Sequence, residues 1–241
     1  MSNCCQTIPP VLAEYPKPKG KWTELNGLKT YVTGPEDAKK SLLIIYDIFG
    51  FSNQLIQGAD LLASQGYRVT MPDFLLGDHP TMAMFQPGGE EDRAKYFSKF
   101  PGNQQSQSEA IGKALTAIKA PGVEKTAVIG LCWGYKAMVV AENINETDAI
   151  IGVHPTFPAP EDGDLINKPS LIIATAGEEP AVMEAIHAKV NAKLPGKNVY
   201  HHFPDRIHGF AGSRADLNDP VKREEFAEAY QIIAKFLKDT I

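Results

Sequence analysis

Short, continuous apolar runs recur along the chain, and segments with helical periodicity separate them. Such runs are typical of strands that are buried on both faces of a sheet. We expect strands at residues 28–32, 42–46, 68–71, 127–129, 149–153, 171–175 and 199–203, the first of them at the sheet edge. We expect helices at residues 54–65, 90–99, 105–118, 136–141, 182–192 and 223–237. This alternation predicts an α/β fold with a mostly parallel central sheet and helices on both faces.

Proline and glycine mark the segments outside this pattern. Residues 1–21 are polar and proline-rich, and we expect an N-terminal arm there, followed by one domain over 22–241. Residues 77–89 are rich in both amino acids and predict a loop over one end of the sheet.

The strand at 127–129 leads directly into Gly130-Leu131-Cys132-Trp133-Gly134 and then into a helix-forming stretch. This is the pattern of a nucleophile elbow, a sharp strand-to-helix turn that exposes a reactive side chain, here with a thiol. Glycines two residues on either side of the nucleophile relieve crowding in the turn. The alternative is a buried core cysteine between two turn glycines.

Three more strands end in reactive groups, and the carboxyl ends of parallel strands meet at one edge of a sheet. Asp47 follows the strand at 42–46, Glu178 and Glu179 follow 171–175, and His208 follows 199–203. The order nucleophile, acid, histidine is that of the α/β-hydrolase fold. We therefore predict a catalytic triad rather than a core thiol.

Composition narrows the function classes. The 241 residues are 43% hydrophobic and 22% charged, with a net charge of −5 and no basic cluster, which argues against nucleic acid or a membrane surface as partner. The first 21 residues lack the apolar centre of a signal peptide, and an odd cysteine count leaves a free thiol, so we expect a cytoplasmic protein. The adjacent Cys4 and Cys5 are either a solvated pair or a lipidation or metal site.

The chain resembles the dienelactone hydrolase family, in particular its eukaryotic, fungal-type branch, from about Gly27 to the C-terminus. The resemblance is carried by the thiol elbow at 130–134, by Asp47-Ile48-Phe49-Gly50, by Pro72-Asp73 and by His208-Gly209-Phe210-Ala211. It implies an α/β-hydrolase fold and hydrolysis of carboxylic esters or lactones.

The resemblance implies a role for each triad member. Cys132 would attack the carbonyl carbon, and His208 would take the thiol proton and later activate water. Alignment of the preceding strands puts Glu179 at the family's aspartate position, so Glu179 is the expected triad acid, with Glu178 as the alternative.

The same resemblance implies supporting groups. The backbone N–H groups of Ile48 and Trp133 would form the oxyanion hole. Asp47 matches a family glutamate that is a partner of the resting thiol; the alternative is a residue that caps the strand end.

The two arginines with which bacterial relatives hold a substrate carboxylate are missing, since Phe74 and Gly212 lie in the matched segments. Arg214 either substitutes for one of them or is a solvated charge. The expected substrate-binding residues are Phe49, Phe74, Tyr135, Phe210 and Arg214, although most of these aromatic residues could equally belong to the core. His79 and His154 are expected to be packed or solvated, and no metal-ligand spacing is visible.

These observations predict a hydrolase of a small-molecule ester or lactone that uses no cofactor and no metal, as a monomer or homodimer. Two alternatives remain open at this point. One is a non-hydrolytic biosynthetic enzyme on the same fold, such as a cyclase, isomerase or lyase. The other is a ligand-binding protein with a residual triad.

Overall fold

The computed structural model describes residues 14, 15 and 17–241, so most of the expected arm at 1–21, with Cys4 and Cys5, lies outside the described residues. An eight-stranded sheet with the order β1-β2-β4-β3-β5-β6-β7-β8 forms its centre. The strands are β1 (Lys21–Leu25), β2 (Leu28–Thr33), β3 (Lys40–Ile45), β4 (Arg68–Pro72), β5 (Lys125–Leu131), β6 (Ala149–Val153), β7 (Ser170–Thr175) and β8 (Val199–Phe203). Strands β3 to β8 are parallel, and β1 and β2 are antiparallel to their neighbours. The predicted α/β architecture is confirmed.

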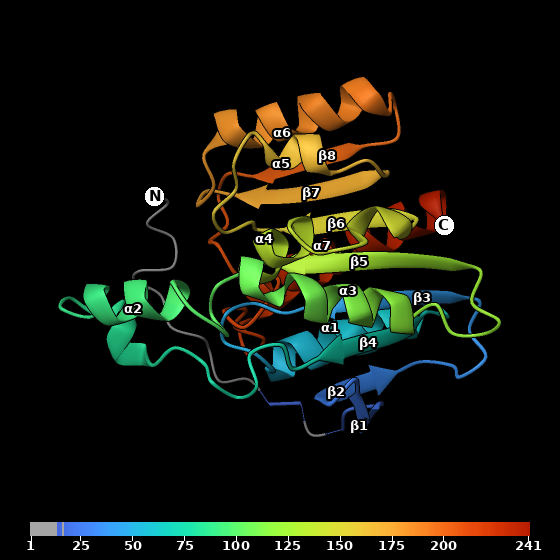
Figure 1. Cartoon of the computed structure of the whole chain (residues 1–241), viewed down its shortest axis with the longest axis horizontal. Coiled ribbons are helices and arrows are strands. Elements are labelled where there is room, and N and C mark those ends of the chain that lie inside the picture. The colour runs from blue at the N-terminus through green and yellow to red at the C-terminus, as the bar shows by residue number, and fades with distance from the viewer. Residues whose placement is uncertain (1–13, 16) are drawn as a thin grey trace.

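Helices cover both faces of this sheet (Figure 1). They are α1 (Asn53–Ala63), α2 (Glu90–Phe97), α3 (Ser108–Ala117), α4 (Trp133–Val139), α5 (Asp162–Leu165), α6 (Pro180–Lys193) and α7 (Pro220–Thr240), with short 3-10 turns at Met82–Phe85, Gln105–Gln107 and Ile144–Glu146. Helices α1 and α7 contact each other on one face, whereas α3 packs beside α4 on the opposite face. The ion pair between Lys136 and Asp162 joins α4 to α5, and α5 packs on α6.

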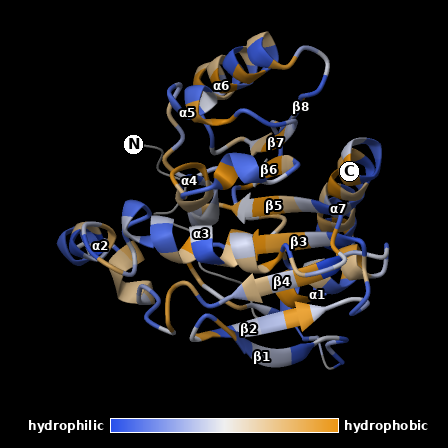
Figure 2. Cartoon of the chain, turned by 45° about the vertical axis from the view of Figure 1, so that its right-hand side comes forward, coloured by the Kyte–Doolittle hydropathy of each residue, from blue (hydrophilic) through white to orange (hydrophobic). Residues whose placement is uncertain are grey.

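The core lies between the two helical layers. Every residue of β6 and β7 is buried, as the continuous apolar runs predict. Figure 2 shows the apolar residues gathered on the central strands and the polar residues on the outer surfaces of the helices. Among the described residues, no helix is both long and apolar enough to cross a membrane.

The prediction that residues 28–32 form the edge strand is wrong, because β1 pairs with the outer side of β2 and is itself the edge of the sheet. Four of the five residues of β1 are exposed, so the strand lacks the apolar pattern that marks the others. Its turn to β2 consists of Asn26 and Gly27, with φ values of 52° and 81°. Asn-Gly between two strands is the strongest short hairpin signal, and it identifies β1 where hydrophobicity does not.

The segment at 77–104 is placed at the carboxyl ends of the strands, and α2 projects there beyond the sheet (Figure 1). The expected loop at 77–89 contains the 3-10 turn Met82–Phe85. Tyr96 anchors α2 by donating to the Asp78 carbonyl at 2.6 Å. Trp133, the first residue of α4, donates its indole N–H to the Gly102 carbonyl at 2.8 Å. These bonds hold the segment against the edge that carries Cys132.

Candidate active site

Cys132 lies in the turn between β5 and α4 with φ 53° and ψ −115°. A Cβ atom on Gly134 would lie 2.2 Å from the Ile45 carbonyl oxygen, and one on Gly130 would lie 2.6 Å from the Gly134 carbonyl oxygen. Only glycine fits either position. A left-handed backbone at a non-glycine residue is strained and persists where the surroundings fix it. Here the Cys132 N–H donates to the Val153 carbonyl at 3.0 Å. The elbow that the sequence predicts therefore has its expected shape.

His208 approaches the elbow from the loop after β8, and its Nδ1 lies 2.6 Å from Glu178 Oε1. The other carboxylate oxygen of Glu178 accepts hydrogen bonds from the Thr175 N–H at 2.5 Å and the Thr175 hydroxyl at 2.9 Å. Both oxygens thus act as acceptors, which makes Nδ1–H of His208 the donor. Imidazole and carboxyl are almost completely buried, so the pair is shielded from water.

The expectation that Glu179 contacts the histidine is wrong. Pro180 is the first residue of α6, which makes Glu179 the N-cap, with extended backbone and an exposed side chain. Glu178 instead turns back onto the end of β7 through its bonds to Thr175. Two sequence signals favour Glu178: the Thr-x-x-Glu spacing from Thr175, and a proline after Glu179 that fixes the start of the helix.

Thr156 lies between the thiol and the imidazole, and sequence reasoning missed it. Its Oγ1 is 3.1 Å from Cys132 Sγ and 3.3 Å from His208 Nε2. Thr156 follows β6, so the rule that ligands meet the carboxyl ends of strands would have brought it into consideration. The loop after β6 therefore contributes a hydroxyl to the site.

The expected oxyanion groups come from two elements, Ile48 from the loop after β3 and Trp133 from the start of α4. Ile48 and Trp133 are buried beside the elbow, and neither backbone N–H has an acceptor within residues 14, 15 and 17–241. Two such donors are available to a developing negative charge. Asp47 contacts a different loop from the one expected: it accepts from the Ser213 N–H at 2.8 Å, from the Ser213 hydroxyl at 2.9 Å and from the Phe49 N–H at 3.0 Å.

Asp47 thus ties the oxyanion loop to the loop that carries His208, whereas its expected contact with the thiol is absent from the described part of the chain. Burial raises the pKa of the Asp47 carboxyl, and the hydrogen bonds from Ser213 and Phe49 oppose that rise. Because its two bonds from Ser213 join two loops, we propose a positioning role for Asp47.

His154 is completely buried next to the triad, with its ring centroid 5.0 Å from that of His208. Neither ring nitrogen has a hydrogen-bond partner in the part of the chain that the structure describes. Burial lowers the pKa of His154 well below 6.5, and the neighbouring His208 lowers it further. His154 is therefore a neutral side chain, as expected for a packed histidine.

The expected substrate-binding residues separate into two groups. Phe49 is half-buried, with its ring centroid 5.6 Å from that of Phe85, and the Arg214 guanidinium lies 5.4 Å from the Phe49 ring. Arg214 also donates to the His208 carbonyl at 3.4 Å, so it is buried in the site and is not a solvated charge. Phe210 packs 6.2 Å from His154.

The other two residues belong to the core. Tyr135 and Phe74 are almost fully buried. The Tyr135 ring lies directly on Gly152 of β6, where a Cβ atom would come within 2.6 Å of it. Phe74 and Tyr135 are as buried as Cys132 and His208, and the expectation that they bind substrate stays a prediction.

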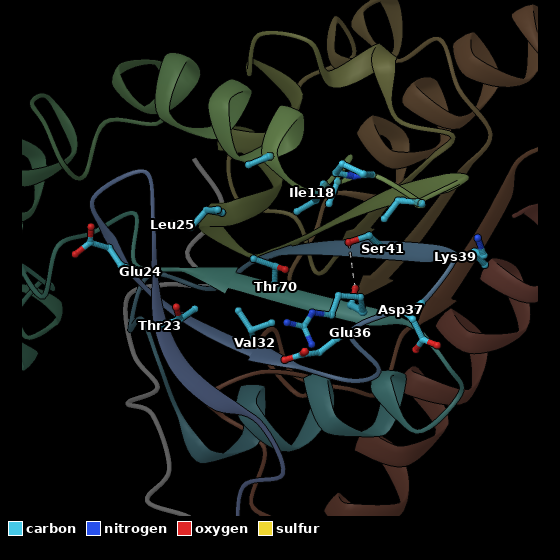
Figure 3. A pocket seen from close by; sticks show the side chains of 17 residues that line it. Thr23, Glu24, Leu25, Val32, Glu36, Asp37, Lys39, Ser41, Thr70 and Ile118 are labelled. Atoms are coloured by element: carbon cyan, nitrogen blue, oxygen red, sulfur yellow. Dashed lines mark hydrogen bonds between the residues drawn. The ribbon is translucent and has the colours of Figure 1, made fainter.

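The triad itself is closed in this structure, since Cys132 is 3% and His208 4% exposed. An open pocket of about 560 Å³ lies elsewhere, at the amino ends of β3 and β4, where Figure 3 shows Ser41, Thr70 and Val32 among its lining residues. No triad residue lines that pocket. In the described chain, no group of three His, Cys, Asp or Glu side chains is suited to a metal ion.

Comparison with known proteins shows the family to which this chain is similar. The model of the dienelactone hydrolase family matches residues 28–241, which is most of the chain. The chain belongs to the dienelactone hydrolase family. An uncharacterised AIM2 family protein of Schizosaccharomyces pombe is 31% identical, with 99% of each chain covered. A carboxymethylenebutenolidase homolog from Rattus norvegicus is 25% identical over 92% of this chain and 91% of its own.

Solved dienelactone hydrolases share the fold of this family member. The enzyme from Anabaena variabilis superimposes with a TM-score of 0.65 at 16% identity, over 92% of this chain and 99% of the other. The resemblance and the α/β-hydrolase fold predicted from the sequence are both confirmed. Membership of the dienelactone hydrolase family supports an ester or lactone hydrolase in general terms.

Proposed function

We propose that this chain hydrolyses carboxylic esters or lactones through a thioester on Cys132, with His208 as acid and base and Glu178 as the residue that orients His208. One observation carries the proposal: the thiol on the elbow is linked through hydrogen bonds to an imidazole whose far nitrogen is held by a buried carboxylate. That arrangement is the nucleophile, base and orienting group of triad catalysis.

Acylation begins when the thiol proton passes to His208 Nε2 and the sulfur attacks the carbonyl carbon. The negative charge that forms on the carbonyl oxygen is stabilised by the N–H groups of Ile48 and Trp133. The C–O bond then breaks, and the proton on His208 Nε2 passes to the alcohol that leaves. Glu178 keeps Nδ1–H in place throughout, so Nε2 is the nitrogen that exchanges protons.

Deacylation repeats these steps with water. His208 Nε2 takes a proton from a water molecule, and the hydroxide oxygen attacks the thioester carbonyl. The C–S bond then breaks, and the proton on Nε2 returns to the Cys132 sulfur, which restores the thiol and the neutral imidazole. Bulk water has little access to the thioester in this closed site, because Cys132 and His208 are both buried.

The groups beside Cys132 favour a mainly apolar acyl part. Phe49, Phe85 and Phe210 supply ring surface, and Arg214 is the charged group that adjoins Phe49. Arg214 donates to the His208 carbonyl, which places its positive charge beside the loop that carries the histidine. We therefore propose neutral or singly charged esters and lactones as the substrate class.

The two adjacent glutamates provide a matched test. Glu178→Gln should lower kcat for p-nitrophenyl acetate and for a small lactone by about 100-fold or more, since the tautomer of His208 is no longer fixed. Glu179→Gln should retain kcat within about twofold, because its side chain is exposed and makes no capping hydrogen bond to α6. Cys132→Ala is the baseline.

Far-UV circular dichroism of each variant checks folding. Hydrolysis that persists in Cys132→Ala would exclude the thiol as nucleophile. Equal losses in the two glutamine variants would exclude Glu178 as the orienting residue.

A further inference from the structure

The connection between the thiol and the imidazole runs through a side-chain hydroxyl. Thr156 Oγ1 is within hydrogen-bonding distance of both Cys132 Sγ and His208 Nε2, at 3.1 and 3.3 Å. Thr156 is 1% exposed, so bulk water does not compete for this position. A threonine hydroxyl has one proton to donate and lone pairs to accept with, which suits it to stand between a donor and an acceptor.

The backbone fixes that hydroxyl relative to the sulfur. The Thr156 N–H donates to the Cys132 carbonyl at 3.1 Å, while the Cys132 N–H donates at 3.0 Å to the carbonyl of Val153, the last residue of β6. His154 and Phe157, on either side of Thr156, have φ values of 39° and 54°. Two residues with left-handed backbone among four consecutive residues are strained, and such strain is retained where it orients a functional group. The loop after β6 is thus shaped to hold Thr156 over the elbow.

The direction of the hydrogen bonds between Cys132, Thr156 and His208 follows from the bond between His208 and Glu178. Glu178 accepts Nδ1–H of His208, which leaves Nε2 of the neutral imidazole as an acceptor. The Thr156 hydroxyl then donates to Nε2, and its lone pair accepts the S–H of Cys132. Every donor in the series Cys132, Thr156, His208 faces an acceptor, and the series ends on a carboxylate.

We propose that Thr156 relays the proton from Cys132 to His208. The S–H bond breaks as its proton bonds to Thr156 Oγ1, while the original hydroxyl proton moves to His208 Nε2. The products are a thiolate, an imidazolium and an unchanged threonine, so atoms and charge balance without another reactant. The relay acts on the reacting sulfur and rests on the function proposed above.

The hydroxyl also stabilises the charge-separated state. After transfer it donates to the thiolate and accepts from the imidazolium, and hydrogen bonds to charged groups are the strong ones. Without the hydroxyl, less thiolate forms at neutral pH. At high pH, hydroxide removes the thiol proton directly and the relay is bypassed.

Alkylation of Cys132 by iodoacetamide tests the relay without any ester substrate. The modified Cys132 peptide is quantified by mass spectrometry, because Cys4 and Cys5 also react. Thr156→Val removes the hydroxyl and keeps the shape; it should slow alkylation at about pH 7 by about 10 to 100-fold and approach the wild-type rate near pH 10. Thr156→Ser keeps a hydroxyl and should recover most of the neutral-pH rate.

Thr147→Val is the matched control, since Thr147 is equally buried and donates only to backbone carbonyls at the start of β6. It should alkylate as wild type does. If Thr156→Val does not fold, as judged by circular dichroism, Thr156→Ser and Thr156→Ala give the same contrast.

Three results would overturn the relay: a wild-type rate for Thr156→Val at pH 7, a rate that stays low near pH 10, or a serine variant as slow as valine. Ester hydrolysis is measured on the same samples. Alkylation that depends on Thr156 without any hydrolysis would keep the relay and reject the proposed function; hydrolysis with Thr156-independent alkylation would do the reverse.

Discussion

Replacement of His154 by asparagine should make the protein less sensitive to acid. Burial and the neighbouring His208 lower the pKa of His154 well below 6.5, so the folded chain keeps this imidazole neutral. Below pH 6.5 the unfolded chain binds a proton that the folded chain does not, and the free energy of unfolding falls as the pH falls. One unit below that value, the loss from this residue reaches about 1.4 kcal/mol. Above pH 6.5 both states are neutral and the contribution is complete.

Asparagine does not titrate, and it tolerates the left-handed backbone at this position, where φ is 39°. The assay is urea unfolding followed by tryptophan fluorescence at about pH 8 and about pH 5.5. The difference in unfolding free energy between wild type and His154→Asn at pH 8 is the reference. At pH 5.5 this difference should shift by about 1.4 kcal/mol in favour of the variant.

Asp47, which also has a shifted pKa, is present in both proteins, so its effect cancels in the difference. His187→Asn is the control: burial also lowers the pKa of His187, but this side chain is only half-buried, and its shift with pH should be smaller. A difference between wild type and His154→Asn that does not change between the two pH values would refute a neutral, buried His154.

Two further substitutions test the framework of the site. Gly134→Ala should lower the free energy of unfolding by about 2 to 4 kcal/mol in the same urea assay, because the new Cβ would lie 2.2 Å from the Ile45 carbonyl oxygen; wild-type stability would contradict the tight elbow. Asp47→Asn should lower kcat about tenfold with little change in KM, since an amide cannot accept all the bonds from Ser213 and Phe49; a change confined to KM would instead indicate substrate contact.

The sequence predicts the elements that bury apolar surface. The strand over 149–153 has the bounds observed for β6, because it is an uninterrupted run that is buried throughout. Exposed elements escape this reasoning: β1 has four exposed residues and α5 only one turn. Periodicity reports burial, so elements stabilised by a turn or by a neighbouring ion pair leave little trace in it.

The residues of the candidate site likewise fall into those that the sequence predicts and those that it does not. Cys132 and His208 lie in motifs whose glycines are dictated by backbone geometry, and such motifs are readable in one sequence. Glu178 and Thr156 are placed by hydrogen bonds between side chain and backbone within short loops. A shift of one residue in such a loop reverses which of two adjacent side chains faces inward, which is why Glu179 was the wrong choice.

The contacts between loops explain how a strained site persists. Cys132, His154 and Phe157 all adopt left-handed backbone, and each such residue costs about 1 to 3 kcal/mol. Hydrogen bonds from Thr156 to Cys132 and from Cys132 to Val153 join the loops after β5 and β6, and each is worth about 1 kcal/mol net.

The two hydrogen bonds therefore offset only part of that cost, and the packing around the buried Cys132 and His154 has to supply the rest. Beneath these loops β5 is paired with β3 on one side and with β6 on the other, so the elbow stands on the centre of the sheet.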